Sequence, residues 1–394
     1  MEKWLPKLNN QETVAMALFA RFPSEMAYSH HVIQIAKGFA KNNCKVNIYY
    51  PKTYNKNTLS ETPEEYYGKL SNINFVEIEN VDITSFKIYE ILPNLLKKIF
   101  YSLNTFIWSR KLKNNSNENL IWSTNPNILA ISKKYFGNVV YEKHGQARYI
   151  QKLSISILKK SNNVLMVGVT EFATNELSVN FDNTLYLPNG VDNNIFLRKE
   201  TNLSINNITV GYIGMLETYG VDKGVLNSII EIDKISTEVR LNVEVIGGPE
   251  NKLYELREFI KTTNSDKNYI IKSIIPHEKV PDTLNNFDIG IVPYPSDTHM
   301  NRYASPMKIF EMAACGVPIL ASDIESHKEL EKFKLGIIYF KNGNFSDFSS
   351  KLQELILDEK LRDKLSKLSL NNIDNLSWEK RMKTILTSAR SSTG

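Results

Sequence analysis

Short apolar runs alternate with amphipathic runs along the whole chain. An apolar run at 14–20 precedes an amphipathic run at 30–42 and a second apolar run at 45–51, which predicts strand, helix and strand. In the second half, helical patterns separate a further set of apolar runs, which lie at 212–216, 243–248, 269–274, 287–294 and 317–323. Apolar strands alternating with helices are typical of parallel sheets that helices cover on both faces. The pattern therefore predicts an α/β protein built from doubly wound sheets.

The chain length favours two such domains. A chain of 394 residues exceeds the size at which a single hydrophobic core stops growing. Proline and an Asn-Gly pair, both strong turn signals, fall in 188–195 between two regions of apolar patterning. We therefore predict an N-terminal domain over 1–187, a hinge at 188–195 and a second domain over 196–376. The segment 377–394 reads as a closing helix, for which Ser377 is the predicted cap.

The composition indicates a globular protein, because hydrophobic residues make up 42% of the chain and charged residues 23%. No apolar run reaches the roughly 18 to 20 residues needed to span a bilayer. The first residues lack the apolar core of a secretory signal. The two cysteines, Cys44 and Cys315, fall in different halves and indicate neither a disulfide framework nor a thiolate metal cluster. We therefore expect a cytoplasmic protein.

Positive charge is concentrated in the first half of the chain. Residues 1–187 hold 22 Lys and Arg against 15 Asp and Glu, whereas the remainder holds 26 against 28. A basic domain points to an anionic surface or partner, although a solvated lysine-rich exterior gives the same balance. Charge alone does not separate the two interpretations.

The segment 92–113 is the strongest candidate for contact with an anionic surface, since it holds five basic residues and no acidic one. At helical spacing, one face carries the apolar positions 92, 95, 96, 99, 103, 106 and 107. The opposite face carries Lys97, Tyr101, Asn104, Trp108 and Lys111. Aromatic residues among lysines suit peripheral contact with an anionic membrane surface. An ordinary amphipathic helix with its apolar face in the core has the same spacing, so both interpretations stay open.

The stretch 305–318 reads as a helix with both ends marked and with an anion site at its start. Ser305 suits the N-cap and Pro306 the first helical position, while a glycine marks the stop. The free amides and positive dipole end of such a helix favour a phosphate, to which Lys308 adds a full charge. Glu311 lies on the same face, where a carboxylate can accept hydrogen bonds from the hydroxyls of a ribose. Phosphate and ribose together indicate a nucleotide, whereas the alternative is a capped helix with a surface ion pair.

The run SPMKIFEMAACGVPILASD resembles the donor-nucleotide motif of retaining glycosyltransferases with the GT-B fold, in particular those of glycosyltransferase family 4. The resemblance implies two Rossmann-like domains facing across a cleft, with Glu311 on the ribose of a sugar nucleotide. The diphosphate is expected at the helix start, on Ser305, Pro306 and Met307. Relatives commonly carry a second glutamate at the position of Tyr303, and this chain resembles the branch in which Ser-Pro-x-Lys replaces that acid.

The hinge and the closing helix also resemble those of the family. The segment 188–195 is similar to its interdomain hinge motif. By the same resemblance, the helix in 377–394 is expected to cross back onto the N-terminal domain, with Trp378 as its anchor.

Candidate site residues in the first half follow the predicted strands. His144 comes directly after an apolar strand and is therefore expected at the carboxyl end of that strand, where ligands bind in α/β sheets. The resemblance implies that His144 contacts the donor sugar and that Arg148 contacts the acceptor. In the loop after the first strand, Ser29 is the predicted N-cap, and Ser29 and His30 are expected near the donor or the acceptor. The alternatives are a histidine used in packing and a plain capped helix.

Glycines and a lysine open the second domain. Gly214 allows close backbone approach, and Lys223 is placed to neutralise a diphosphate, although a solvated lysine at a helix start has the same spacing. Relatives often carry an arginine where this chain has Met215, so one phosphate contact is either absent or supplied by Lys308. The predicted catalytic residues are thus His144, Lys223 and Lys308, and Gly214 and Met215 join the donor-binding set.

No motif indicates a metal or another cofactor. The chain has no Asp-x-Asp sequence, and its six histidines show no metal-ligand spacing. It also lacks a GxSxG motif, a phosphate-binding loop of the GxxxxGK[ST] type and a recognisable nucleic-acid module. We expect a nucleotide-sugar substrate, no cofactor, no required metal and no nucleic-acid partner.

The resemblance implies a retaining transferase that moves a hexose-type sugar from a nucleoside diphosphate sugar, with UDP favoured over GDP. The expected acceptor is a hydroxyl of a cell-surface polysaccharide or a lipid-linked saccharide, reached from the cytoplasm or from the inner face of the membrane. Two alternatives stay open, a sugar-nucleotide epimerase of the same fold and a catalytically silent nucleotide-sugar-binding protein.

Overall fold

The computed structural model describes residues 11–24, 27–53, 59, 61–115, 118–199, 207–218, 220–263 and 265–391. The chain divides into two compact units. Unit 1 comprises residues 1–168, 174–187 and 378–394, and unit 2 comprises residues 169–173 and 188–377.

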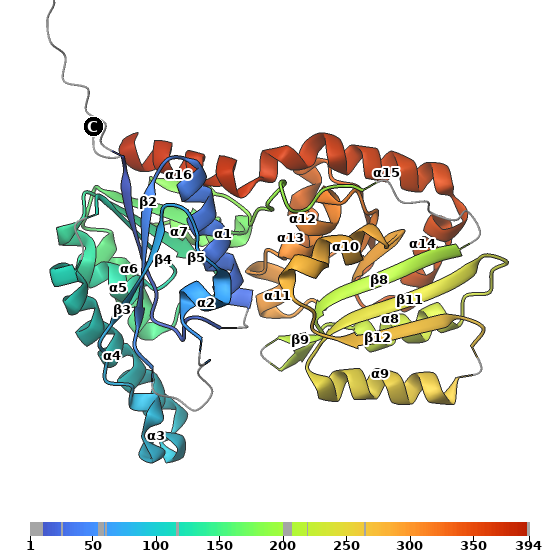
Figure 1. Cartoon of the computed structure of the whole chain (residues 1–394), viewed down its shortest axis with the longest axis horizontal. Coiled ribbons are helices and arrows are strands. Elements are labelled where there is room, and N and C mark those ends of the chain that lie inside the picture. The colour runs from blue at the N-terminus through green and yellow to red at the C-terminus, as the bar shows by residue number, and fades with distance from the viewer. Residues whose placement is uncertain are drawn as a thin grey trace, which may run out of the picture. The chain divides into compact units, whose positions relative to one another are not determined.

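Unit 1 is built on a seven-stranded sheet in the order β3-β2-β1-β4-β5-β6-β7 (Figure 1). Every strand pair is parallel. The strands are β1 (Thr13–Ala17), β2 (Lys45–Pro51), β3 (Ile73–Ile78), β4 (Leu120–Ser123), β5 (Asn138–Lys143), β6 (Val164–Gly168) and β7 (Thr184–Tyr186). The central strands are buried along their length, as expected for a sheet that is covered on both faces.

Helices connect and cover the strands of unit 1. They are α1 (Ala27–Lys41), α2 (Pro63–Tyr67), α3 (Lys87–Ile91), α4 (Asn94–Asn115), α5 (Pro126–Ser132), α6 (Tyr149–Leu158) and α16 (Trp378–Ser391). Helix α7 (Glu171–Ser178) begins in unit 2 and ends in unit 1. Short 3-10 turns lie at Ile83–Ser85 and Lys133–Tyr135.

The C-terminal helix α16 lies along α1 (Figure 1). Gly38 of α1 permits this approach, because a Cβ there would lie 2.7 Å from the Trp378 carbonyl oxygen and 2.7 Å from the Met382 Cγ. Asn42, at the end of α1, donates a hydrogen bond to the Glu379 carbonyl oxygen at 2.8 Å. The last helix of the chain is therefore packed as part of unit 1.

Unit 2 is built on a six-stranded parallel sheet in the order β12-β11-β8-β13-β14-β15. The strands are β8 (Asn207–Met215), β11 (Arg240–Gly248), β12 (Asn268–Ser273), β13 (Ile289–Val292), β14 (Ile319–Ser322) and β15 (Ile337–Phe340). A small antiparallel pair joins β9 (Glu217–Thr218) and β10 (Val221–Asp222).

The helices of unit 2 surround this sheet. They are α8 (Val225–Asp233), α9 (Glu250–Thr262), α10 (Val280–Asn285), α11 (Thr298–Arg302), α12 (Met307–Ala314), α13 (Glu325–Lys328), α14 (Phe345–Leu357) and α15 (Glu359–Asn372). Short 3-10 turns lie at His277–Lys279, Glu329–Phe333 and Ile373–Leu376. The prediction of an α/β protein with two doubly wound parallel sheets is therefore confirmed, and each apolar run named in the second half overlaps a strand.

Helix α4 turns its faces in the opposite sense to the one predicted. Trp108 and Asn104, assigned to the outer face, are buried, whereas Leu103 and Ile107 of the apolar face are 50% and 58% exposed. The polar face is drawn inward by specific contacts. The Trp108 ring lies edge-on to Phe19 with centroids 5.6 Å apart, and the Asn104 amide donates to the Val81 carbonyl oxygen at 2.7 Å. Helical periodicity identified the two faces but not which of them binds the sheet.

Candidate functional site

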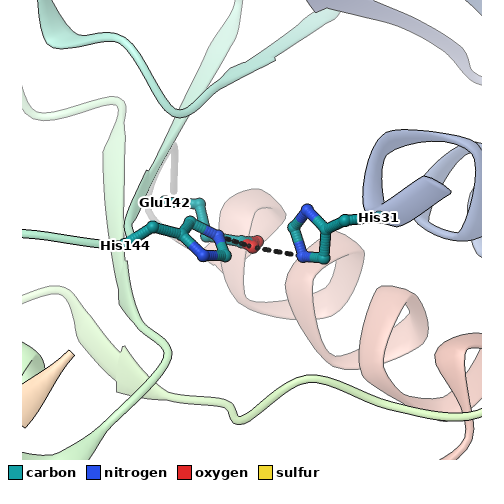
Figure 2. Close-up of side chains that lie close together, drawn as sticks. All are labelled: His31, Glu142 and His144. Carbon is teal, nitrogen blue, oxygen red and sulfur yellow. Dashed lines mark hydrogen bonds and ion pairs between the residues drawn. The ribbon is translucent and has the colours of Figure 1, made fainter. Parts of the chain in front are cut away.

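A fully buried carboxylate, that of Glu142, lies near the carboxyl end of β5. One oxygen, Oε1, lies 2.7 Å from His144 Nε2, which is a hydrogen-bond distance. The other, Oε2, accepts from Arg381 Nη1 at 2.9 Å and from Trp122 Nε1 at 3.1 Å. Residues two apart on a strand face the same side, which brings Glu142 and His144 together immediately after β5. Figure 2 shows the Glu142 carboxylate between the rings of His144 and His31.

The charge of Glu142 is balanced inside the protein. Burial raises the pKa of this carboxyl group, but the charge of Arg381 and the contacts of His144 and His31 outweigh it and hold the pKa well below its ordinary value. A buried ionised carboxylate is tolerated only when it is paired and hydrogen-bonded. Arg381 meets that requirement from α16, where its Nη2 also donates to the Leu187 carbonyl oxygen at 3.1 Å.

The two histidines differ in their access to solvent. His31, on α1, has its Nε2 3.5 Å from Glu142 Oε1, and its side chain is only 6% exposed. Its ring meets those of His144 and Trp378 edge-on, at centroid distances of 4.7 Å and 5.4 Å. The His144 side chain, in contrast, is 31% exposed. His144 is therefore the member of this cluster that a ligand can reach.

Two imidazoles and a carboxylate are also a ligand set that zinc accepts. The nearest donor atoms of His31, Glu142 and His144 all lie within 4.8 Å of one another. Two contacts favour a hydrogen-bonded cluster instead. The 2.7 Å separation of His144 Nε2 and Glu142 Oε1 is a hydrogen-bond distance, and the Arg381 guanidinium beside the same carboxylate repels a cation. That the protein requires no metal stays a prediction.

In unit 2, Lys308 and Glu311 form the ion pair that their spacing predicts. The Lys308 Nζ lies 2.9 Å from Glu311 Oε2, and His277 Nε2 lies 3.9 Å from Oε1. Glu311 is buried, so the alternative of a surface ion pair is wrong. Burial raises its pKa, but Lys308 and His277 overcome this effect and lower the pKa to about 2. Helix α12 thus carries a buried, ionised acceptor beside a lysine.

The start of α12 differs from the prediction. The helix begins at Met307, Pro306 occupies the N-cap, and no side chain caps it. The Ser305 hydroxyl instead accepts a hydrogen bond from the Asn189 backbone N–H at 2.9 Å, and the Asn189 side chain donates to the Ser305 carbonyl oxygen at 2.7 Å. The prediction that Ser305 is the cap was wrong because Asn189 occupies its hydroxyl. Among the described residues, no side chain accepts a hydrogen bond from the first amides of α12, so these amides are suited to an anion.

Lys223, just before α8, is buried, which contradicts the alternative of a solvated lysine. Its ammonium lies 4.6 Å from the Tyr294 ring centroid and 3.4 Å from the Tyr294 hydroxyl. Across the residues that the structure describes, no carboxylate forms an ion pair with it. Neighbouring Asp222 is engaged elsewhere, with its Oδ1 accepting the Gly224 N–H at 2.7 Å. A buried ammonium without a carboxylate is expected to attract an anionic ligand.

The end of β8 approaches α12. At Gly214, whose φ is +140°, a Cβ would lie 3.6 Å from Lys308 Cε. A Cβ on Gly247 would lie 1.8 Å from the Gly214 carbonyl oxygen, so these two backbones meet where only glycine fits. Met215 is partly exposed, and its carbonyl oxygen accepts the Tyr212 hydroxyl at 2.6 Å. Gly214, Lys308 and Glu311 are therefore gathered at one place in unit 2.

Tyr303, where relatives commonly carry an acid, is a buried aromatic residue. Its ring lies edge-on to Phe172 with centroids 5.4 Å apart. The neighbouring Arg302 lies over the Phe172 ring, with its guanidinium carbon 4.7 Å from the ring centroid. Packing, rather than ligand charge, therefore accounts for the aromatic residue at this position.

Three other predicted residues lie apart from the contacts described above. Helix α1 begins at Ala27, so Ser29 lies inside it and the predicted N-cap is wrong. Ser29 is buried, and its hydroxyl shares a 2.7 Å hydrogen bond with that of Ser24. His30 is partly exposed, with its ring 6.3 Å from that of Tyr67. Arg148 is exposed at the start of α6.

Sequence reasoning missed Glu142, His31 and Arg381. The stretch EKHGQ places Glu142 two positions before His144, and that spacing could have identified it. Arg381 gave no comparable signal, because it lies 239 positions from the carboxylate that it binds.

Comparison with known proteins agrees with this architecture. Residues 194–370 match the family model described as "Glycosyl transferases group 1". Sucrose-phosphate synthase from Thermosynechococcus elongatus has a similar structure, with a TM-score of 0.70 at 12% identity over 96% of this chain and 98% of that one. HepE of Anabaena in complex with UDP and glucose has a TM-score of 0.65 at 14% identity, over 95% of this chain and 99% of that one. A glycosyltransferase from Rickettsia africae has a TM-score of 0.69 at 15% identity, over 97% of this chain and 99% of that one.

These structural likenesses establish the fold as GT-B, with two Rossmann-like domains, as the sequence predicted. No curated protein matches the chain in sequence. Among the described residues, no helix is both long enough and apolar enough to cross a membrane.

Proposed function

We propose that this protein is a retaining glycosyltransferase that moves a hexose-type sugar from a nucleoside diphosphate sugar, with UDP favoured, to a saccharide hydroxyl. The observation that carries the proposal is the buried Glu311 carboxylate of unit 2, with Lys308 paired to it. The same unit holds Lys223, a buried lysine that pairs with no carboxylate among the described residues. The match of residues 194–370 to the Glycosyl transferases group 1 model supports it. So does the fold shared with HepE, whose structure holds UDP and glucose.

The donor is expected to bind unit 2 through two kinds of contact. Glu311, ionised and buried, can accept hydrogen bonds from both ribose hydroxyls. The uncapped amides at the start of α12, together with Lys308 and Lys223, suit the diphosphate. Negative charge grows on the diphosphate as the sugar leaves, so the same groups would stabilise the transition state more than the ground state.

The proposed chemistry needs no nucleophile from the protein. The bond from the sugar C1 to the diphosphate oxygen breaks, and the acceptor hydroxyl forms a bond to C1 on the same face. The acceptor proton passes to the departing phosphate oxygen. His144 in unit 1, as the exposed member of its cluster, is suited to hold a hydroxyl of the sugar.

The acceptor side is proposed to work at the inner face of an anionic membrane, on a lipid-linked or cell-surface saccharide. Unit 1 exposes a row of large apolar side chains on α3 and α4, here named the α3–α4 surface. Its members are Phe86, Ile88, Ile91, Leu95, Leu96, Phe100, Leu103 and Ile107. An exposed apolar surface of this extent marks an interaction site rather than an ordinary exterior.

The charges around the α3–α4 surface favour lipid over a neutral partner. Lys87, Lys98 and Arg110 are exposed on the same two helices. Figure 1 shows α3 and the start of α4 extending beyond the sheet of unit 1, on the side away from α16. Apolar side chains flanked by basic ones match the acyl and headgroup layers of an anionic bilayer. The face of residues 92–113 that carries Trp108 and Asn104 is turned inward, so the proposed membrane contact is made by the apolar face and not by the lysine and aromatic face that the sequence suggested.

Calorimetric titration of UDP, GDP and ADP into the wild type and Glu311→Ala tests the donor site. We expect selective binding of UDP and at least a tenfold weaker affinity in the variant, because the ribose hydroxyls lose a charged acceptor. Glu354→Ala is the matched control, since Glu354 forms an exposed pair with Lys351 at the same spacing of three residues.

Each result has a defined meaning. Unchanged UDP affinity in Glu311→Ala would reject the donor site, and binding of no nucleotide would reject the nucleotide-sugar function. Binding of UDP-sugar without transfer to any acceptor, or conversion of its sugar without an acceptor, would replace the transferase with the silent or the epimerase alternative.

A further inference from the structure

We infer that Glu142, clamped by Arg381, holds the His144 ring with its hydrogen on Nε2 and so presents Nδ1 as a hydrogen-bond acceptor for a ligand hydroxyl. Glu142 and Arg381 are thus positioning residues for His144. The inference deepens the proposed function, on which the identity of the ligand rests, but the state of the ring can be measured without it.

A single proton lies between His144 and Glu142. Their contact joins Nε2 to Oε1 at 2.7 Å. The opposite oxygen, Oε2, already accepts from Arg381 and from the Trp122 indole, which has only a hydrogen to offer. A carboxylate held by these donors carries no hydrogen of its own, so the hydrogen in the 2.7 Å contact belongs to Nε2. In the neutral imidazole, Nδ1 is then the acceptor.

Packing on one side restricts the His144 ring. His31 lies edge-on to His144 on one side, and Trp378 lies edge-on to His31 behind it. His31 and Trp378 are both buried, so the His144 ring packs on this side against the interior of unit 1. A ring that is fixed by a hydrogen bond on one nitrogen and by packing on one side presents its other nitrogen in a defined direction.

The His144 side chain is accessible to a ligand. Within the part of the chain that the structure describes, the only hydrogen bond of His144 is the one from Nε2 to Glu142. Its side chain is the exposed end of a cluster whose other members are buried. The cluster is therefore arranged to fix one nitrogen and leave the second to a ligand. A neutral acceptor there suits a hydroxyl donor and disfavours a second acceptor such as a phosphate oxygen.

The C-terminal helix positions the arginine that binds Glu142. Arg381 comes from α16, the last helix of unit 1, and reaches both Glu142 and the Leu187 carbonyl oxygen. The close contact of α16 with Gly38 of α1 fixes the position from which it reaches. The C-terminal helix thus supplies the counter-charge that keeps the Glu142 carboxylate an acceptor.

Long-range ¹H–¹⁵N correlation spectra of the full chain, labelled with ¹⁵N-histidine, test the inference directly. The chain has six histidines, and loss of one signal set in His144→Asn assigns that residue. At about pH 8, above the ordinary histidine pKa of about 6.5, we expect a protonated-type shift at Nε2 and an unprotonated-type shift at Nδ1. A hydrogen on Nδ1, an even mixture of the two forms, or a spectrum that changes when EDTA is added would overturn the inference. The last result would indicate a metal at these residues.

Variants extend the test to the clamp. In Glu142→Gln the fixed form should give way to a mixture. In Arg381→Met the doubly protonated ring should appear at a higher pH than in the wild type, because the unbalanced carboxylate recruits a proton as the pH is lowered from 8. Arg381→Lys should restore the wild-type spectrum, and Arg390→Met, on the exposed side of the same helix, should leave it unchanged. A wild-type spectrum in both Glu142→Gln and Arg381→Met would refute the clamp.

Kinetics separate this inference from the proposed function. With an active acceptor, Glu142→Gln should lower kcat at least tenfold while the UDP affinity of unit 2 stays unchanged. An equal loss of UDP affinity would indicate general misfolding and contradict a positioning role. If the wild type transfers no sugar, the proposed function fails, yet the histidine spectra still decide whether Glu142 fixes His144.

Discussion

Replacing Arg381 with methionine tests whether the charge of Glu142 is balanced as the structure indicates. The change removes the 2.9 Å contact to Oε2 and the 3.1 Å contact to the Leu187 carbonyl oxygen, while keeping most of the side-chain volume. Removing one partner of a buried ion pair costs about 3 to 5 kcal/mol, because the other charge stays buried without compensation. His144 and Trp122 still donate to the carboxylate, so we expect the lower end, about 3 kcal/mol at pH 8.

The destabilisation of Arg381→Met should depend on pH with a defined sign. In the wild type the folded-state pKa of Glu142 is depressed, so its stabilising contribution is complete above the unfolded-state value and is lost only as the pH falls toward the folded one. In the variant, the unpaired carboxylate favours a protonated histidine. A histidine whose pKa is raised on folding stabilises below about pH 6.5 and loses that contribution as the pH rises. The variant should therefore be closer to the wild type at pH 6 than at pH 8.

Urea unfolding followed by tryptophan fluorescence measures this in unit 1 alone, because Trp108, Trp122 and Trp378 lie in unit 1 and unit 2 contains no tryptophan. Arg390→Met is the matched control on the same helix, since Arg390 forms an exposed pair with Glu12 that is worth less than about 1 kcal/mol. A loss in Arg381→Met within 1 kcal/mol of that control at pH 8, or an equal loss at both pH values, would refute the reasoning.

Combining Arg381→Met with Glu142→Gln isolates the pairing from the packing. The double variant leaves no unbalanced charge, so its loss of stability should be smaller than the sum of the two single losses by about 2 kcal/mol. Additive losses would mean that the two side chains act independently.

Two further predictions address unit 2 and the α3–α4 surface. Lys223→Met should weaken UDP binding about tenfold or more while leaving the stability of the free protein unchanged or higher, because an apolar side chain replaces a buried ammonium that has no carboxylate. Thermal unfolding with and without UDP measures both effects, and Lys234→Met, at an exposed lysine, is the control. A less stable free protein with normal UDP affinity would contradict this prediction. Leu103→Asp combined with Ile107→Asp should abolish sedimentation with vesicles containing phosphatidylglycerol without altering the fold, since both side chains are exposed. Val179→Asp, at an even more exposed apolar position elsewhere in unit 1, should still bind. Wild-type protein that does not bind these vesicles would refute the proposed membrane contact.

The periodicity of the chain was sufficient for the fold, because strands buried on both faces must be apolar along their length and helices between them must be amphipathic. Local spacing was also sufficient for the Lys308–Glu311 pair, since residues three apart on a helix are neighbours whatever surrounds them. The position of His144 followed in the same way from the end of an apolar strand.

Local sequence patterns could not predict which of several partners a side chain binds. Ser29 and Ser305 have the chemistry of helix caps, but neither is a cap in the structure. The Ser29 hydroxyl shares a hydrogen bond with that of Ser24, and the Ser305 hydroxyl accepts one from the Asn189 backbone. Which face of α4 binds the sheet was likewise decided by contacts that Trp108 makes with another segment. A pattern within one element cannot rank such contacts, because their partners lie elsewhere in the chain.

The cluster around Glu142 depends entirely on tertiary structure. His31, Glu142 and Arg381 come from the first helix, the fifth strand and the last helix, and only the fold brings them within hydrogen-bond or ion-pair distance. In the unfolded chain each of these groups is solvated and behaves independently. Removing them from water together makes each charge depend on the others, since a buried carboxylate persists only beside its donors. The sequence by itself thus determined the two sheets and the pair on α12, whereas folding decided which histidine faces a ligand and which groups hold it there.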